Sequence, residues 1–132
     1  MGNNGLTSVV EGSILVKKKW ASRLYADPAF VPALTQRWRE LRAAGLVEDL
    51  LVRVDRHAAR LSATGAARRN FDRWPVLGVR VWPNPPESVD RTTYRSEVDA
   101  LRTWLLARVA WMDAHVHELA VARSASNPGG QR

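Results

Sequence analysis

The sequence contains no cysteine, which excludes disulfide bonds, thiol catalysis and cysteine-ligated metal sites. It has no hydrophobic run near the roughly 20 residues that a membrane-spanning helix requires. Its opening residues also lack the order of charged and apolar residues that marks a secretory signal peptide. Neither a Walker A motif nor a GxGxxG pattern occurs, so we expect no glycine-rich phosphate-binding loop.

The few histidines are badly spaced for binding a metal ion. His115 and His117 lie two positions apart, and on a helix this spacing turns their side chains about 200° away from each other. Asp55 and His57 have the same spacing. We therefore predict no metal-binding residue in this chain.

Serines and paired carboxylates are the remaining candidates for chemistry. All of them fall within or at the ends of expected helices, none of the serines lies in a strand–turn–helix elbow, and the helix dipole explains the carboxylates. These residues are Ser13, Ser22, Ser62, Ser96, Glu48, Asp49, Glu97 and Asp99. We predict no catalytic residue among them.

The sequence is rich in tryptophan and in positive charge. The 20 Lys and Arg residues exceed the 13 Asp and Glu residues, which gives a net charge of +7. The arginines are scattered among acidic residues and only Lys17–Lys19 form a cationic run, so solvated helix faces explain the charge better than a ligand does. Tryptophans need a core or a docking partner. They are Trp20, Trp38, Trp74, Trp82, Trp104 and Trp111.

Helical spacing of apolar residues recurs through the first half of the chain. After a loop over Met1–Gly12, a short helix is expected over Ser13–Tyr25. A second helix is expected between the capping Asp27 with Pro28 and the terminating Gly45. Its apolar face is Phe30, Val31, Leu34, Trp38 and Leu41.

A third helix is expected over Val47–Asp72, with a kink or break at Gly65, before Trp74-Pro75 ends it. Prolines then indicate an ordered loop over Pro75–Asp90, in which Leu77–Val81 forms at most a short edge strand.

The last helix is expected to begin near Thr93 or Ser96 and to run to about Val121, and Ser124–Arg132 should be a disordered tail. The predicted fold class is all-α, with about four helices and one proline-rich ordered loop.

Two polar groups allow both a functional and a structural interpretation. Arg68, Arg69, Asn70, Arg73 and Trp74 could hold a phosphate or stack a base. We favour a structural role for them, in which the cations oppose the helix dipole at a helix end and Trp74 anchors the following turn.

In the last helix, Arg108 lies near Trp104 and Trp111 in sequence, and Asp113 follows them. Guanidinium stacking or a buried ion pair would fix helix packing there.

Five blocks of this sequence, in order, resemble the C-terminal part of the CotH (spore coat protein H) kinase family. The first is W-x-x-R-L-x-x-D-P-x-F at Trp20–Phe30, and R-W-x-x-L-R follows at Arg37–Arg42. The similarity spans about Gly2 to Asp113. The remaining blocks are Arg69–Pro75, Val81–Pro85 with Tyr94, Glu97 and Val98 after it, and Leu101–Asp113.

The resemblance implies that the intact protein is an atypical kinase that uses ATP and a divalent metal and is secreted or lies on the spore surface. Gly2-Asn3 resembles the pair that follows the acidic metal-binding motif of the family, so Asn3 is the one cofactor-binding candidate. No residue here matches the metal carboxylates, the phosphate-binding lysine or the catalytic base that phosphoryl transfer needs.

On this resemblance, residues 1–123 form the C-terminal helical subdomain of a CotH-like kinase, inactive alone, and residues 124–132 form its tail. Its partner is then the missing N-terminal kinase lobe or a separately encoded counterpart, and an exposed tryptophan surface is expected where that lobe docks. The alternative is a small basic helical module that binds nucleic acid or an acidic protein through Lys17–Lys19 or the Arg68–Arg73 group. A nucleic-acid partner is the less favoured of these.

Overall fold

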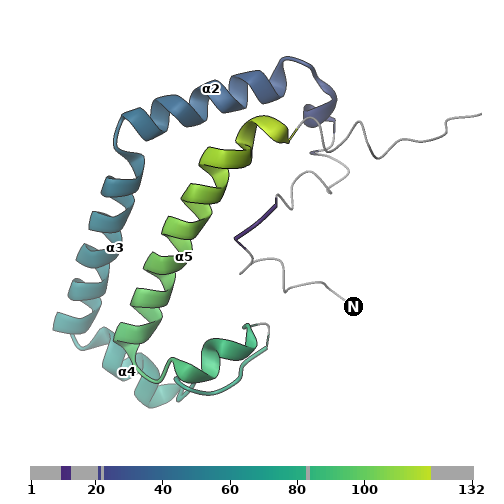
Figure 1. Cartoon of the computed structure of the whole chain (residues 1–132). Helices are drawn as coiled ribbons and strands as arrows, with labels where there is room; N and C mark the ends of the chain where they lie inside the picture. Colours follow the sequence, from purple (N-terminus) through teal and green to yellow (C-terminus); the bar gives the residue numbers. More distant parts are fainter. Residues whose placement is uncertain (1–9, 13–20, 22, 83, 120–132) are drawn as a thin grey trace, which may run out of the picture. The chain divides into compact units, whose positions relative to one another are not determined.

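The computed structural model describes residues 10–12, 21, 23–82 and 84–119, and the regular secondary structure of this part of the chain consists of helices joined by loops, with no strand (Figure 1). The predicted all-α class is confirmed. The segment Leu77–Val81 forms no strand. Most of the predicted helix Ser13–Tyr25, residue Val121 and the predicted tail lie outside the described residues. No described helix is long and apolar enough to cross a membrane.

The chain divides into two compact units. We call Val47–Ala107 the α3 unit, and Glu11–Leu46 together with the chain from Arg108 onward the α2 unit. Helix α5, Tyr94–His115, contributes its first part to the α3 unit and its last part to the α2 unit.

Helix α2, Phe30–Ala43, follows the punctuation that its sequence predicts. The Oδ1 atom of Asp27 accepts a hydrogen bond from the backbone N–H of Ala29 at 2.8 Å, which orders the turn that enters the helix. After the helix, the N–H of Ala44 donates to the carbonyl of Glu40, and Gly45 has a φ of 80°. The predicted boundaries at Asp27 and Gly45 are therefore confirmed to within a few residues.

The core of the α2 unit collects residues from three short stretches. The 3₁₀ turn η3, Leu24–Ala26, contributes Tyr25, and the ring of Tyr25 meets that of Phe30 edge-on at 5.2 Å. The buried members of this core are Ala21, Tyr25, Val31, Val116 and Leu119, with Phe30, Leu34, Trp38, Trp111 and Met112 packed against them.

The end of α5 differs from the predicted continuous helix to Val121. The α-helix stops at His115 and continues as a 3₁₀ turn, η5, over Val116–Glu118. A 3₁₀ turn has three residues per turn, so Val116 and Leu119 lie on the same side. Both are buried in the α2-unit core. The 3₁₀ turn forms here because it places both side chains on the face that packs into this core.

Gly65 breaks the predicted third helix into α3, Leu46–Ala63, and α4, Ala66–Arg73. Gly65 has a φ of 68°, a left-handed conformation that glycine adopts at little cost. Arg69 donates a hydrogen bond from Nη1 to the carbonyl of Thr64 at 3.0 Å, which satisfies a backbone acceptor just beyond the end of α3. The predicted acidic first turn, Glu48 and Asp49, is present in α3.

Helix α5 begins after a loop and a second 3₁₀ turn, η4, Pro86–Asp90. Thr93 and Ser96 cap it reciprocally, because the N–H of Thr93 donates to Ser96 Oγ at 3.1 Å and the N–H of Ser96 donates to Thr93 Oγ1 at 3.0 Å. Of the two predicted start points, Thr93 is therefore the cap and Ser96 lies in the first turn.

Candidate functional site

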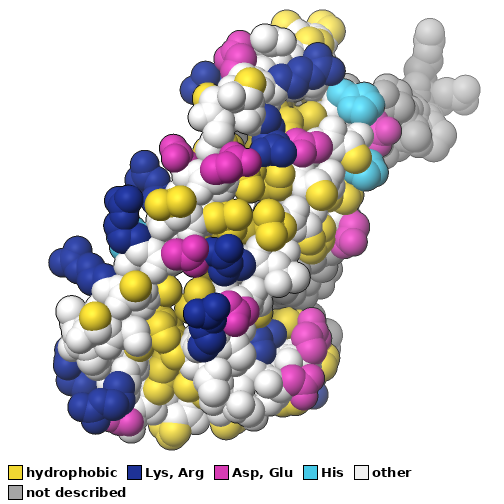
Figure 2. Space-filling view, turned by 60° about the vertical axis from the view of Figure 1, so that its left-hand side comes forward, with side chains coloured by type: hydrophobic (Ala, Val, Ile, Leu, Met, Phe, Trp, Pro, Cys, Tyr) yellow, Lys and Arg dark blue, Asp and Glu magenta, His cyan; other side chains and the backbone are white. Residues whose placement is uncertain are grey.

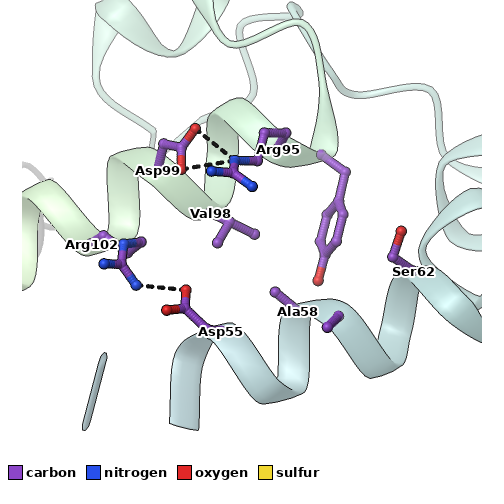
Figure 3. A pocket seen from close by; sticks show the side chains of 9 residues that line it. Asp55, Ala58, Ser62, Arg95, Val98, Asp99 and Arg102 are labelled. Atoms are coloured by element: carbon purple, nitrogen blue, oxygen red, sulfur yellow. Dashed lines mark hydrogen bonds and ion pairs between the residues drawn. The ribbon is translucent and has the colours of Figure 1, made fainter. Parts of the chain in front are cut away.

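The α3 unit contains a cavity of about 520 Å³ between α3 and the first part of α5. Figure 3 shows Arg102 of α5 pointing toward Asp55 of α3 across it, while Arg95 and Asp99 pair with each other along α5. Arg102 donates to Asp55 across the two helices, and Arg95 donates from Nε to both carboxylate oxygens of Asp99, at 3.1 and 3.0 Å. The lining residues are Asp55, Ala58, Ala59, Ser62, Tyr94, Arg95, Val98, Asp99 and Arg102.

The charges in this cavity compensate one another. Each of the two arginines is already bound to an aspartate, so an anionic ligand would have to displace a carboxylate before it gained a guanidinium partner. Ser62 also lines the cavity, but the two carboxylates among the lining residues, Asp55 and Asp99, are paired with arginines. The arrangement therefore joins α3 to α5, and it does not have the parts of a catalytic centre.

A second, apolar groove of about 410 Å³ lies between the same two helices. Leu61 and Leu101 are each 46% exposed beside it. His57 lines this groove, while its neighbour Asp55 lines the polar cavity. Figure 2 shows hydrophobic side chains open to solvent between basic and acidic ones on one face. The apolar lining consists of Leu50, Val54, Ala58, Leu61, Tyr94, Val98 and Leu101, with Arg53, His57 and Glu97 beside it.

The predicted Arg68–Trp74 group is spread along α4 and its end. Arg68 pairs with Asp72 at 3.4 Å, and Arg69 holds the Thr64 carbonyl. The guanidinium of Arg73 lies 5.6 Å from the centre of the Trp74 ring, within the range of a cation–π contact. These contacts agree with the structural role, although Arg69 serves the preceding helix α3 and not the end of α4.

Arg108 stacks on Trp111, as one of its two predicted arrangements requires. The guanidinium lies 4.6 Å from the Trp111 ring centre, and Nη1 donates to the carbonyl of Gly12 at 2.7 Å. Partial burial lowers the pKa of Arg108, and the charge of Glu11 partly offsets this effect. Arg108 therefore ties α5 to the first described residues of the α2 unit.

Asp113 joins helices α2 and α5 within the α2 unit. Its Oδ1 accepts a hydrogen bond from Trp38 Nε1 at 2.8 Å and one from Arg42 Nε at 3.0 Å. Nearby on α5, the ring of His115 stacks on that of Trp111 at 4.7 Å. His115 is therefore part of the packing, and His117 lies 3.8 Å from Glu118.

Other site predictions fall beyond what the structure describes. Asn3 and Lys17–Lys19 lie outside the described residues. Within the described ranges, no three His, Asp or Glu side chains gather closely enough to hold a metal ion. Sequence reasoning missed the Asp55–Arg102 pair, which joins positions far apart in the chain. The Arg95–Asp99 pair was readable from its spacing of four residues on a helix.

Comparison of the chain with models of protein families, with curated proteins and with solved structures finds no match.

Proposed function

We propose that this chain is the helical part of an atypical kinase of the CotH type, and that it acts by packing against a nucleotide-binding kinase part. The order and spacing of five sequence blocks support the family. ATP and a divalent metal would be held by the kinase part. The described residues do not fit that role, since the cavity arginines are paired with aspartates and no described cluster could hold the metal.

The observation that carries the proposal is the shortage of buried hydrophobic side chains in the α3 unit. Among its described residues only Val47 is a buried hydrophobic residue, whereas ten large hydrophobic side chains are exposed. Exposed apolar surface of this kind marks an interaction site in a soluble protein. These residues are Val52, Leu61, Trp74, Val76, Val79, Val81, Trp82, Val89, Leu101 and Leu106.

The apolar groove between α3 and α5 is the part of this surface that we assign to the kinase part. It is formed by two regular helices, and Leu61 and Leu101 beside it are available for burial. Burial of such apolar side chains in an interface removes them from water and favours association.

A titration of the 132-residue chain with the purified nucleotide-binding part of a CotH-family kinase, followed by calorimetry, tests the proposal. We expect saturable binding that Leu61→Asp weakens by about tenfold or more. Leu24→Asp is the matched control, because Leu24 is also 46% exposed but belongs to the α2 unit. Metal-dependent ATP binding by the chain alone, or no binding of the kinase part, would contradict the proposal.

The basic-module alternative remains as a second candidate, and it has weaker support. Arg68 and Arg69 already bind Asp72 and the Thr64 carbonyl, so they offer less to a phosphate than free guanidinium groups would. This candidate requires salt-sensitive binding to nucleic acid that Arg68→Gln and Arg73→Gln reduce. Absence of such binding at low salt would remove it.

A further inference from the structure

Five apolar side chains are exposed within nine consecutive residues of the α3 unit. We call this segment, from Trp74 to Trp82, the Trp74–Trp82 loop. The two tryptophans at its ends are 58% and 75% exposed, and three valines between them are also exposed. These valines are Val76, Val79 and Val81.

The loop is held in place at its centre. The N–H of Gly78 donates to the carbonyl of Arg91 at 2.9 Å, and a Cβ at Gly78 would lie 3.0 Å from Thr92 Cγ2. The N–H of Val79 donates to the Val76 carbonyl at 3.2 Å. The middle of the loop is therefore hydrogen-bonded to the segment before α5, and the valines and tryptophans on either side of Gly78 are exposed to solvent.

Arginines accompany the apolar side chains. Arg73 precedes the loop and lies over the Trp74 ring, and Arg80 lies within it between two valines. Residues 66–82 carry four arginines and one aspartate, and that aspartate, Asp72, is paired with Arg68. Residues 66–82 therefore combine exposed apolar side chains with an excess of positive charge.

This combination matches an anionic lipid surface. Tryptophan rings favour the interface between headgroups and acyl chains, and arginines bind the phosphates there. The valines would be buried at the boundary between headgroups and acyl chains. Nucleic acid would not bury them, because its bases stack on aromatic side chains. We infer that the Trp74–Trp82 loop binds the surface of a membrane that contains anionic phospholipids. This inference uses residues outside the α3–α5 groove, although the exposed side chains of the loop also belong to the surface from which the kinase proposal is argued.

Sedimentation of the full chain with lipid vesicles tests the inference. At physiological ionic strength we expect about tenfold stronger binding to phosphatidylcholine mixed with phosphatidylserine than to phosphatidylcholine alone. The double variant Trp74→Ala/Trp82→Ala should weaken binding to the mixed vesicles by about tenfold or more. The variant Arg73→Gln/Arg80→Gln should weaken it by about fivefold, because Glu87 and Asp90 of η4 already reduce the positive field.

Matched controls distinguish the loop from the rest of the unit. Val52→Ala/Leu106→Ala removes two exposed hydrophobic side chains from α3 and α5, and Arg56→Gln/Arg60→Gln removes two exposed charges from α3. Both should keep nearly wild-type binding. If Trp74→Ala/Trp82→Ala loses its helical circular dichroism, the comparison of the two arginine variants decides the question.

Three outcomes would overturn the inference. The first is no sedimentation of the wild-type chain with the mixed vesicles, and the second is equal binding by the loop variants and their controls. The third is a loop variant that loses affinity for the CotH kinase part or for nucleic acid while its vesicle binding is unchanged. Failure of the kinase titration with intact vesicle binding would contradict only the proposed function.

Discussion

The α2 unit and the α3 unit are both helical, but the α2 unit buries hydrophobic side chains that form a core, whereas the α3 unit leaves most of its large hydrophobic side chains exposed. Among the described residues, five of the six buried hydrophobic residues belong to the α2 unit, and ten of the eleven large exposed hydrophobic residues belong to the α3 unit. Helices form in both units because local spacing and caps favour them. Packing then stabilises a helix only where its apolar face is covered, and in the α3 unit much of that face is open.

This difference contrasts a unit with a buried hydrophobic core and a unit whose large hydrophobic side chains are mostly exposed, among the residues that the structure describes. The α2 unit adds the Trp38–Asp113 and Arg42–Asp113 bonds to its core, which link α2 to the end of α5. In the α3 unit the long-range Asp55–Arg102 pair involves an aspartate side chain that is 60% exposed, and exposed ion pairs contribute little to stability. We therefore expect the two units to respond differently to equivalent substitutions.

The largest expected effect comes from truncating a core valine in the α2 unit. Val31 is 3% exposed, so Val31→Ala should lower the free energy of unfolding by about 2 kcal/mol. Val52→Ala is the matched change on α3, where the side chain is 54% exposed, and should change it by less than about 0.5 kcal/mol. Urea unfolding followed by circular dichroism measures both, and equal losses would break the comparison between the units.

A smaller effect is expected at the turn that fixes the Trp74–Trp82 loop. Gly78 has a φ of 71°, and an added Cβ would meet Thr92 Cγ2 at 3.0 Å. Gly78→Ala should cost about 2 kcal/mol or slightly less from backbone strain and crowding together. Gly65→Ala has a similar φ of 68° but meets only the flexible end of Arg69, so about 1 kcal/mol is expected. Thermal unfolding of the two variants shows which one loses more stability. A larger loss of stability for Gly65→Ala than for Gly78→Ala would contradict the prediction.

The smallest effect concerns the aspartates that join helices in each unit. Asp113→Asn keeps an acceptor for Trp38 but loses the charge that Arg42 binds, so a loss of about 1 kcal/mol is expected. Asp55→Asn removes the charge partner of Arg102 at a more exposed site and should cost about 0.5 kcal/mol or less. The urea concentrations at the unfolding midpoints of the two variants measure these losses. A larger loss of stability for Asp55→Asn than for Asp113→Asn would contradict the prediction.

Local features of the fold were readable from the sequence, because their causes lie within a few residues. Asp27 and Gly45 bound α2, Gly65 breaks the next helix, and Thr93 with Ser96 begins α5. Each of these signals is a cap or a backbone requirement that operates within one turn. The all-α class followed from them.

The side-chain pairs that join one helix to another could not be predicted from local sequence signals. Trp38 meets Asp113 across 75 positions and Arg102 meets Asp55 across 47, and only tertiary packing brings such residues together. The sequence also suggested that apolar residues between Pro75 and Asp90 would order the loop. An exposed tryptophan surface was expected from the family resemblance, but the sequence did not indicate that Trp82 would be part of it, or that Val79 would be exposed beside the hydrogen-bonded Gly78.

The central proposal is that a partner completes the α3 unit, whose described residues include one buried hydrophobic residue, Val47. Hydrogen exchange of the isolated chain tests it most directly. We predict that amides of α3 and of α5 up to Ala107 exchange at least about tenfold faster than those of α2. Addition of the CotH kinase part should slow exchange in the α3 unit and leave α2 nearly unchanged. Equal protection of α2 and α3 in the isolated chain would contradict the account.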